Sequence, residues 1–287
     1  MSVVADVLGV ARSNLHERVA GRSKARGPYR KDEDAELLPV IRRLVDERPT
    51  YGYRRIAALL NRERKGTALP PVNRKRVLRI MGAHGLTLQR STGRREGRVH
   101  DGKVAVMRSD LRWCSDALEI ACWNGERVRV AFIIDAFDRE VIAFVAVAGS
   151  GISGSDVRDM MLDAVETRFD ATRAPHPVEH LSDNGSCCTA KETRNFAAAL
   201  NLVPCFTPVR SPESNGMSEA FVKTLKRDYV RLTPLPDARS VLALVPEWIA
   251  DYNAVHPHSA LRFRSPVEPK VGVASSAPRS TPSRTVR

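Results

Sequence analysis

Hydrophobic positions follow two different periods along the chain, and the change falls near residue 104. Before it, apolar residues recur every three or four positions, the spacing of helices that bury one face. After it come short apolar runs rich in β-branched residues, which alternate with helical stretches. The pattern therefore predicts an all-α first part and an α/β second part.

The first part contains two groups of predicted helices. Residues 1–24 predict two short helices around a turn, with Gly9 in the left-handed position, as in a helix-turn-helix-like segment. Residues 35–86 predict three further helices, an arrangement typical of a helix-turn-helix DNA-binding domain. A polar, basic, glycine-containing linker is expected over 87–104.

The second part, over 105–270, predicts a mixed sheet flanked by helices. Three consecutive strands are expected near 111–120, 128–134 and 141–147, followed by alternating helices and strands and a C-terminal helix. This order indicates an α/β fold with helices on both faces of the sheet. The remaining residues, 271–287, are low in complexity and basic, so a disordered tail is expected.

The charge of the chain is divided in the same way as its periodicity. All of the formal net charge of +13 falls in the first third, because residues 1–100 hold 23 of the 46 Lys and Arg residues but 10 of the 33 Asp and Glu residues. An excess of cations on helices favours nucleic acid as the partner. Basic residues cluster on the predicted third helix of the domain, and the candidates for DNA contact are Arg54, Arg55, Arg74, Lys75, Arg76 and Arg79. A plain solvated surface is the alternative interpretation.

Other classes of protein are excluded or disfavoured. No apolar run reaches the length of a membrane span, and the first residues lack the pattern of a secretory leader, so a cytoplasmic protein without a membrane partner is expected. The five cysteines form no CxxC pair and have no histidines at ligand spacing. Reduced thiols are therefore expected, and a zinc site is disfavoured.

Three acidic residues stand out by their positions. Asp116 lies in the middle of the first strand, where Asp is rare. Asp183 ends the fourth predicted strand and Glu219 lies in the first turns of a long helix. Three converging carboxylates repel one another unless cations lie between them. Two Mg²⁺ ions bound there would activate an attacking oxygen and stabilise a leaving oxygen at a phosphate.

Each of these acids also has a structural interpretation. Asp116 could be a strand-edge residue, Asp183 could serve only as a turn former, and Glu219 could simply pair with Lys223 one helical turn away. Competing carboxylates are Asp135 and Asp138, which bracket a hairpin, and Glu119, which points to the opposite face from Asp116.

The sequence motifs around these acids resemble those of a known family. The segments are RWCSD, LSDNGS, VRSPESNG followed by EAFVKTLKRDY, and DYNAVHPHSAL with SPVEP. There are 35 residues between Asp183 and Glu219, and Lys226 follows them. These motifs and this spacing resemble the second-reading-frame (OrfB-type) transposases of the IS-three family of insertion sequences, in particular their IS-two-like subgroup. These enzymes carry the DDE catalytic core of retroviral integrases. The predicted helical segment RPTYGYRRIAALLN resembles the helix-turn-helix that precedes that core.

The resemblance implies a fold, an activity and a set of roles. The fold is a ribonuclease-H-like mixed sheet, and the activity is cleavage at element ends followed by joining of the freed 3′-hydroxyl to DNA. Asp116, Asp183 and Glu219 would be catalytic ligands of two Mg²⁺ or Mn²⁺ ions, and Lys226, with Lys223, would contact DNA. Asn184 and Gly185 would shape the turn beside the second Asp.

The resemblance also implies partners and leaves alternatives open. Double-stranded DNA, as terminal repeats and as target, would be bound by a homo-oligomer, together with an upstream-frame OrfA product or as its frameshifted fusion. Cys188 stands where the family commonly has an aromatic residue. The alternatives are a DNA-binding regulator of transposition that is inactive without OrfA, and a nuclease that does not join.

Overall fold

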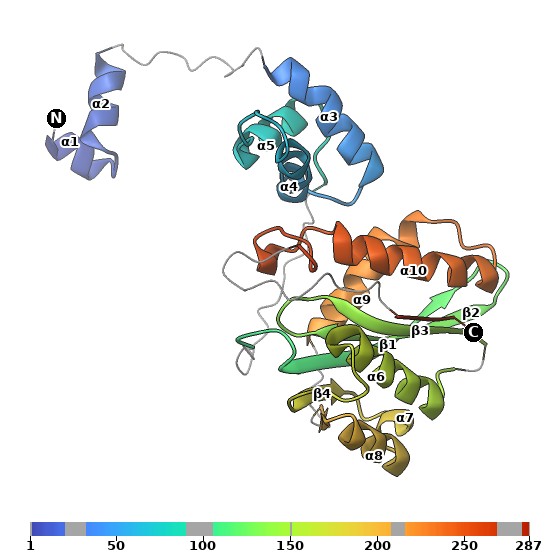
Figure 1. Ribbon diagram of the computed structural model, residues 1–287. Helices are drawn as coiled ribbons and strands as arrows, with labels where there is room; N and C mark the ends of the chain where they lie inside the picture. Colours follow the sequence, from blue (N-terminus) through green and yellow to red (C-terminus); the bar gives the residue numbers. More distant parts are fainter. Residues whose placement is uncertain are drawn as a thin grey trace.

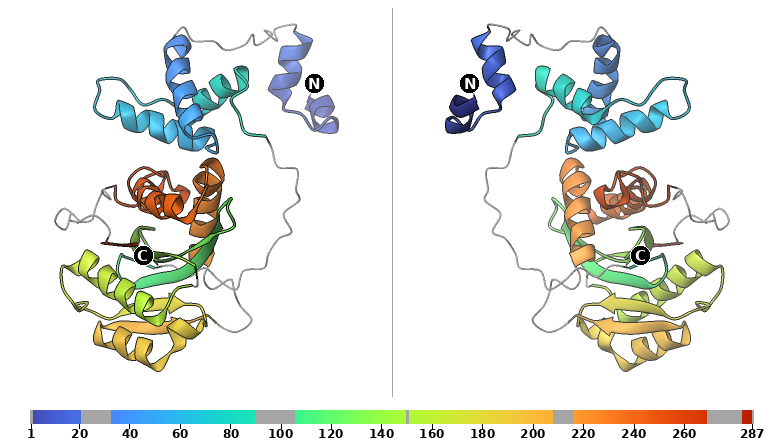
Figure 2. Two further views of the ribbon diagram at one scale, coloured as in Figure 1. Left: turned by 90° about the vertical axis from the view of Figure 1, so that its right-hand side faces the viewer. Right: turned by 90° about the vertical axis from the view of Figure 1, so that its left-hand side faces the viewer.

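A computed structural model describes most of the chain in two connected regions and one separate helical pair (Figures 1 and 2). The residues that it describes are 2–20, 33–89, 106–149, 151–207, 216–268 and 283–286. The predicted linker over 87–104 lies largely outside them. The helical pair consists of α1 (Ser2–Val7) and α2 (Arg12–Val19), with Gly9 at φ 60° between them. The two helices and the left-handed glycine agree with the prediction for this segment.

Three helices form the second unit, as the periodicity predicts. They are α3 (Asp34–Glu47), α4 (Tyr53–Arg64) and α5 (Arg74–Ala83). The side chain of Asn73 caps α5 by accepting a hydrogen bond from the backbone N–H of Lys75, which fixes where the basic helix begins. Apolar residues at helical spacing meet in one buried core, which includes Leu37, Ile41, Ile56, Leu60, Val77 and Met81. We call this unit, residues 33–89, the helical domain.

The α/β unit is built on a six-stranded mixed sheet. Its strands are β1 (Arg112–Ala121), β2 (Arg127–Asp135), β3 (Val141–Ala148), β4 (Val178–Ser182), β5 (Leu202–Phe206) and β6 (Ser283–Val286), in the order β5-β4-β1-β2-β3-β6. Short connections make β1, β2 and β3 antiparallel, whereas β4 and β5 return through helices and run parallel to β1. The predicted mixed α/β fold is therefore confirmed.

Helices cover both faces of the sheet (Figures 1 and 2). One face carries α6 (Gly154–Phe169), α7 (Ser186–Thr189) and α8 (Lys191–Ala199), and the other carries α9 (Gly216–Asp228) and α10 (Ala238–Ala254). Single 3₁₀ turns follow α9 at Val230–Leu232 and α10 at Ser259–Leu261. Ser153 caps α6 through a capping box with Asp156.

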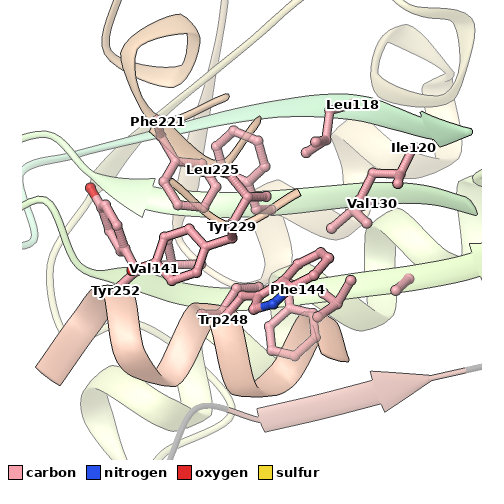
Figure 3. Packing of buried hydrophobic residues seen from close by; sticks show 14 of the residues in the cluster. Leu118, Ile120, Val130, Val141, Phe144, Phe221, Leu225, Tyr229, Trp248 and Tyr252 are labelled. Atoms are coloured by element: carbon pink, nitrogen blue, oxygen red, sulfur yellow. The ribbon is translucent and has the colours of Figure 1, made fainter. Parts of the chain in front are cut away.

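The core between the sheet and the helices α9 and α10 combines aliphatic residues with a group of aromatic ones (Figure 3). Phe221 of α9 packs edge-on against Phe132 of β2, with ring centroids 4.5 Å apart, and against Tyr252 of α10 at 4.8 Å. Asn253 of α10 also exchanges two hydrogen bonds with the backbone of Val141 at the start of β3, at 2.8 and 2.9 Å. These contacts hold α9 in one position over the strands.

A buried arginine organises the turn between β2 and β3. Arg168 of α6 has a 2% exposed side chain and forms ion pairs with Asp110 (3.1 Å), Asp138 (3.0 Å) and Glu140 (3.0 Å). Asp135 lies at 3.9 Å and accepts the backbone N–H groups of nearby residues. Asp135 and Asp138 thus do more than bracket a hairpin, because they compensate a buried guanidinium.

The helical domain is fastened to the C-terminal end of α9. Asp228, whose side chain is 2% exposed, accepts a hydrogen bond from the Thr50 hydroxyl at 2.6 Å and from the Arg55 guanidinium at 3.2 Å. Arg227 donates to the same carboxylate at 2.6 Å. The helix that carries Glu219 therefore ends in a contact with the helical domain.

A second part of this contact joins the helical domain to α10. Arg48 pairs with Asp251 through two hydrogen bonds of 2.6 and 2.8 Å. The Tyr51 hydroxyl and the His256 ring form a buried hydrogen bond of 2.8 Å. Burial lowers the pKa of His256 to about 2, aided by Arg55 and other cations, so the imidazole is neutral here. We refer to the contacts of Asp228, Asp251 and His256 with the helical domain as the domain clasp.

The end of the chain differs from its expectation. A disordered tail is predicted over 271–287, but Ser283–Val286 form β6, which pairs in parallel with β3. Without this pairing, β3 would be an edge strand with unpaired backbone groups, which a short segment can satisfy whatever its sequence. The rest of the tail lies outside the described residues.

Two further findings bear on the class of protein. All five cysteines are free thiols, as expected. Within the described ranges, no helix is long and apolar enough to cross a membrane.

Candidate active site

Asp116 lies in the middle of β1 and faces α9. Side chains alternate along a strand, and Cys114 and Leu118, two residues to either side, both belong to the core under α9 and α10. Asp116 is half-buried, and its Oδ1 accepts a hydrogen bond from the N–H of Ala117 at 2.8 Å. Glu119 points to the opposite face, where it pairs with Arg127 and Arg129.

Asp183 lies beside Asp116 because of the register between two parallel strands. Cys114 of β1 is opposite Leu181 of β4. Two residues further along each strand, the same register places Asp116 and Asp183 at one level of the sheet. Asp183 follows the last residue of β4 and is exposed, and its Oδ1 accepts the backbone N–H of Gly185 at 3.1 Å.

The two residues after Asp183 shape its loop. The Asn184 side chain donates to the backbone carbonyl of Thr207, which follows β5, at 2.8 Å, and so ties the loop to the next strand. A Cβ atom on residue 185 would lie 3.0 Å from Oδ1 of Asp183. Gly185 is therefore needed for close approach of the backbone to the carboxylate, and not for an unusual backbone angle.

Glu219 and Lys226 lie on one side of α9, two helical turns apart. Phe221 and Leu225 bury the adjacent side of the helix in the core, so Glu219 borders the sheet without entering the core. Glu219 forms an ion pair of 3.1 Å with Lys223, the pairing weighed as the alternative interpretation. Lys226 is partly exposed, and the structure gives it no hydrogen bond or ion pair with another described residue.

The three carboxylates act on one another electrostatically. Burial raises the pKa of Asp116, and the negative charges of Asp183 and Glu219 raise it further, while the hydrogen bond from Ala117 lowers it. The charges of the other two acids therefore both act on Asp116. They do not form a closed cage, since among the described residues no three His, Cys, Asp or Glu side chains are grouped closely enough to surround one ion.

The donor chemistry of this site suits hard divalent cations. All three side chains offer carboxylate oxygens, the ligands that Mg²⁺ and Mn²⁺ prefer. In the described part of the chain, Oδ2 of Asp116 and Oδ2 of Asp183 accept no hydrogen bond, so both remain available as donors. A cation between the acids would also relieve the repulsion that raises the pKa of Asp116.

The residues expected to contact DNA have three different environments. Arg54, Arg74 and Lys75 are exposed on the helical domain. Arg55 belongs instead to the domain clasp, where its guanidinium pairs with Asp228. Lys223 is exposed but pairs with Glu219.

Arg76 and Arg79 are used within the helical domain. Both donate to the carboxylate of Asp34 at the start of α3, at 2.6 and 2.5 Å, and Arg76 also reaches Glu33 at 3.1 Å. The sequence did not reveal this use, because Asp34 lies about forty residues earlier and only the packing of α3 against α5 brings the groups together.

We expect Arg79→Met to weaken the helical domain more than it weakens DNA binding. The substitution keeps the aliphatic stem but removes a partly buried ion pair, so the free energy of unfolding should fall by about 1 kcal/mol. Urea unfolding and DNA binding by the full chain measure the two effects. The matched control is Lys75→Met on the same helix. Lys75 is exposed, so this substitution should weaken DNA binding more than it lowers the free energy of unfolding. A large loss of affinity in Arg79→Met with unchanged stability would contradict this assignment.

Comparisons with known proteins agree with this organisation. A family described as "Integrase core domain" matches residues 107–212, and a second family of the same description matches 202–266. A family described as "HTH-like domain" matches residues 31–95, which contain the whole helical domain.

Individual relatives come from bacterial insertion elements. The transposase InsD of insertion element IS2 from Escherichia coli is 45% identical over 276 residues, which cover 93% of this chain and 90% of InsD. An uncharacterized protein of insertion element IS136 from Agrobacterium tumefaciens is 71% identical over 186 residues, which cover 65% of this chain and 95% of that protein. Among solved structures, the catalytic domain of Mos1 transposase with raltegravir and Mg is similar with a TM-score of 0.43 and 18% identity, over 49% of this chain and 71% of that one.

Proposed function

This chain belongs to the insertion-element transposases that carry an integrase core, and from that premise we propose that Asp116, Asp183 and Glu219 are its catalytic acids. The observation that carries the proposal is geometric: the register of β1 and β4 sets Asp116 and Asp183 at one level of the sheet, and α9, which carries Glu219, packs on the face that Asp116 shares. The negative charges of Asp183 and Glu219 accordingly raise the pKa of Asp116, in addition to the larger effect of burial. The chain is thus an enzyme of the DDE polynucleotidyl transferase class, and its reaction takes place where β1, the end of β4 and α9 meet.

The proposed reaction has two phosphoryl-transfer steps on DNA. In the first, water attacks a phosphodiester at the element end, and a 3′-hydroxyl leaves. In the second, that hydroxyl attacks a phosphodiester of the target, and the 3′-oxygen of the target strand leaves. Two Mg²⁺ or Mn²⁺ ions, held by the three acids, would supply activation of the attacking oxygen and stabilisation of the leaving one.

The chain's own residues position the DNA and the acids. Gly185 and Asn184 hold Asp183 at the level of Asp116, and the aromatic core under α9 holds Glu219 beside the sheet. Lys226, two turns after Glu219, has its ammonium available to bind a backbone phosphate near the site. The helical domain contributes further cations, with Arg54, Arg74 and Lys75 exposed.

The partners follow from the reaction. Joining two element ends to one target requires two active sites, so we propose a homo-oligomer assembled on double-stranded DNA. An OrfA product, as a separate chain or as a fusion, is proposed as a further partner on the family resemblance alone.

A cleavage and joining assay tests the proposal against the two alternatives. We expect the full chain, with or without OrfA, to nick a duplex that carries the element end and to join it to target DNA when Mg²⁺ or Mn²⁺ is present, and to do neither in EDTA. DNA binding without cleavage, even with OrfA and metal, would indicate the regulator. Cleavage without joined product would indicate a nuclease.

A further inference from the structure

A strongly basic hollow lies where the helical domain meets the segment that follows α10, residues 259–268. Its volume is about 320 Å³, and it is lined by α4, the first residue of α5 and this segment, which Figure 1 shows in red beneath α4. Six of its lining side chains are cationic, namely Arg54, Arg62, Lys65, Arg74, Arg262 and Arg264. Such a concentration of cations in one concavity attracts an anion.

The chain neutralises only part of this charge. Glu268, the acidic side chain that lines the hollow, pairs with Arg62 at 3.2 Å and with Lys65 at 3.6 Å. Arg62 also donates to the backbone carbonyl of Val255 at 2.8 Å, so it ties both the end of α10 and, through Glu268, the segment to α4. Arg74 and Arg262 are exposed, and among the described residues neither has a carboxylate within ion-pair distance. The hollow therefore keeps a net positive charge at its rim.

The segment that brings Arg262 to the hollow is held in a defined shape. Arg262 and Phe263 both have left-handed backbone angles, with φ of 56° and 64°. Hydrogen bonds on either side pin the segment, from His258 N–H to the Arg264 carbonyl at 2.9 Å and from Val267 N–H to the Asn253 carbonyl at 3.2 Å. Non-glycine residues persist at such angles where their surroundings hold them, which indicates that the backbone at Arg262 has a defined position beside α4.

We propose that this hollow binds the phosphate backbone of the DNA end, with Arg74 and Arg262 on one stretch of phosphates. Guanidinium groups match phosphate oxygens in a planar, two-pronged geometry. Arg74 is the first residue of α5 and is followed by the exposed Lys75, so the basic surface continues from the hollow along the helix. Any helix-turn-helix domain could use Arg74. A contribution from Arg262, about 190 positions later in the chain, makes the DNA site a composite of the helical domain and the core.

This inference rests on the proposed function, since it assumes that the chain binds element-end DNA. Its consequence is geometric. A duplex held by both parts of the chain would be fixed relative to the acids, because the segment that carries Arg262 is continuous with α10 and α10 packs on the same sheet as β1. The role proposed for Arg74 and Arg262 is binding and positioning, and neither touches the reacting atoms.

Salt-dependent binding of DNA by the full chain tests the site. The probes are a duplex of element-end sequence and a scrambled duplex of equal length. With Arg74→Ala and Arg262→Ala combined, two phosphate contacts are lost. The negative slope of log K against log salt should become shallower by about 2, and affinity should fall roughly tenfold to a hundredfold near 0.1 M salt. Both duplexes should be affected equally, since phosphates carry no sequence information. Arg262→Ala alone should make the slope shallower by about 1.

Two further variants separate charge from folding. The pair Arg74→Lys and Arg262→Lys keeps both charges and should keep most of the slope. The matched control, Arg173→Ala with Arg194→Ala, removes two exposed arginines from the α6–α8 side of the sheet and should bind as the unmodified chain does. An Arg262→Ala chain with unchanged affinity and slope would overturn the composite site while leaving the proposed function intact. Failure of the unmodified chain to bind either duplex would overturn both.

Discussion

Replacing any one of the three acids by its amide is expected to abolish cleavage and joining while DNA affinity is retained. Asp116→Asn, Asp183→Asn and Glu219→Gln each keep the shape of the side chain and remove one carboxylate charge. The ions that these acids would hold contribute several kcal/mol of stabilisation to the transition state. At about 1.4 kcal/mol per tenfold change in rate, the loss should be a thousandfold or more. Gel assays of nicked and joined products measure it.

The matched control is Glu119→Gln, on the same strand as Asp116. Glu119 points to the opposite face and pairs with Arg127 and Arg129 at the surface. Its loss should leave the rate near that of the unmodified chain, because surface ion pairs contribute little. Near-normal joining by any one of the three amide variants would remove that residue from the site. In Glu219→Gln it would favour the ion pair with Lys223 as the whole role of Glu219.

Replacing Arg168 by methionine is expected to cause a large loss of stability. Arg168 compensates a set of buried or half-buried carboxylates at the turn between β2 and β3. Methionine would preserve much of the packing but leave these charges without their cation, and breaking a buried pair in this way costs about 3–5 kcal/mol. The free energy of unfolding from urea titration measures the effect. The control is Arg173→Met, at an exposed position nearby, which should unfold as the unmodified chain does.

The pH dependence of this loss has a definite sign. Burial raises the pKa of Asp135 from 3.8 to about 7, with Asp138 adding to the shift and Arg168 opposing it. Between these two values the folded chain holds the proton more tightly than the unfolded chain, so ionisation of Asp135 lowers stability as the pH rises. Without Arg168, no guanidinium stabilises the ionised form of Asp135. The loss of unfolding free energy in Arg168→Met should therefore grow from pH 4 towards pH 8. A deficit that shrinks over this range would show that the arginine does not act through these carboxylates.

The domain clasp gives α9 a role at both of its ends. Glu219 lies in its first turn, and Asp228 at its last residue binds Thr50 and Arg55 of the helical domain. The helix between the two links the position of the helical domain to the position of Glu219, one of the proposed catalytic acids. Arg55 serves this contact, although its place among basic residues made it a candidate for DNA contact.

Much of the fold was predictable because its signals are local. The capping residue Ser153, the β-branched run of β2 and the three-to-four spacing of α3 each depend on neighbours within one or two turns. The strand at Ser283–Val286 was not predictable in this way, because it pairs through its backbone with an edge that lies more than a hundred residues earlier.

The candidate site likewise combines residues with a local sequence signal and residues whose use depends on distant parts of the chain. Asp116, Asp183 and Glu219 could be singled out in the sequence because each has an unusual local setting, and family resemblance linked them. Sequence reasoning missed the ion pairs of Arg168 and Arg76 and the role proposed for Arg262. Each depends on partners or neighbours contributed by a distant part of the chain, and the only signal for Arg168 was the density of acids around the turn at 135–140.

The sequence by itself determined the family and the order of helices and strands up to the C-terminal tail, and it singled out the three acids proposed as catalytic, because periodicity, capping and motif spacing are properties of neighbouring residues. Only the tertiary structure decided how the charges of the chain are used. A guanidinium that pairs with a buried or partly buried carboxylate contributes to stability, as in Arg55, Arg79 and Arg168. One at the rim of a hollow, such as Arg262, remains available to a phosphate. Composition counts these residues alike, whereas burial and the distance to the nearest opposite charge distinguish them.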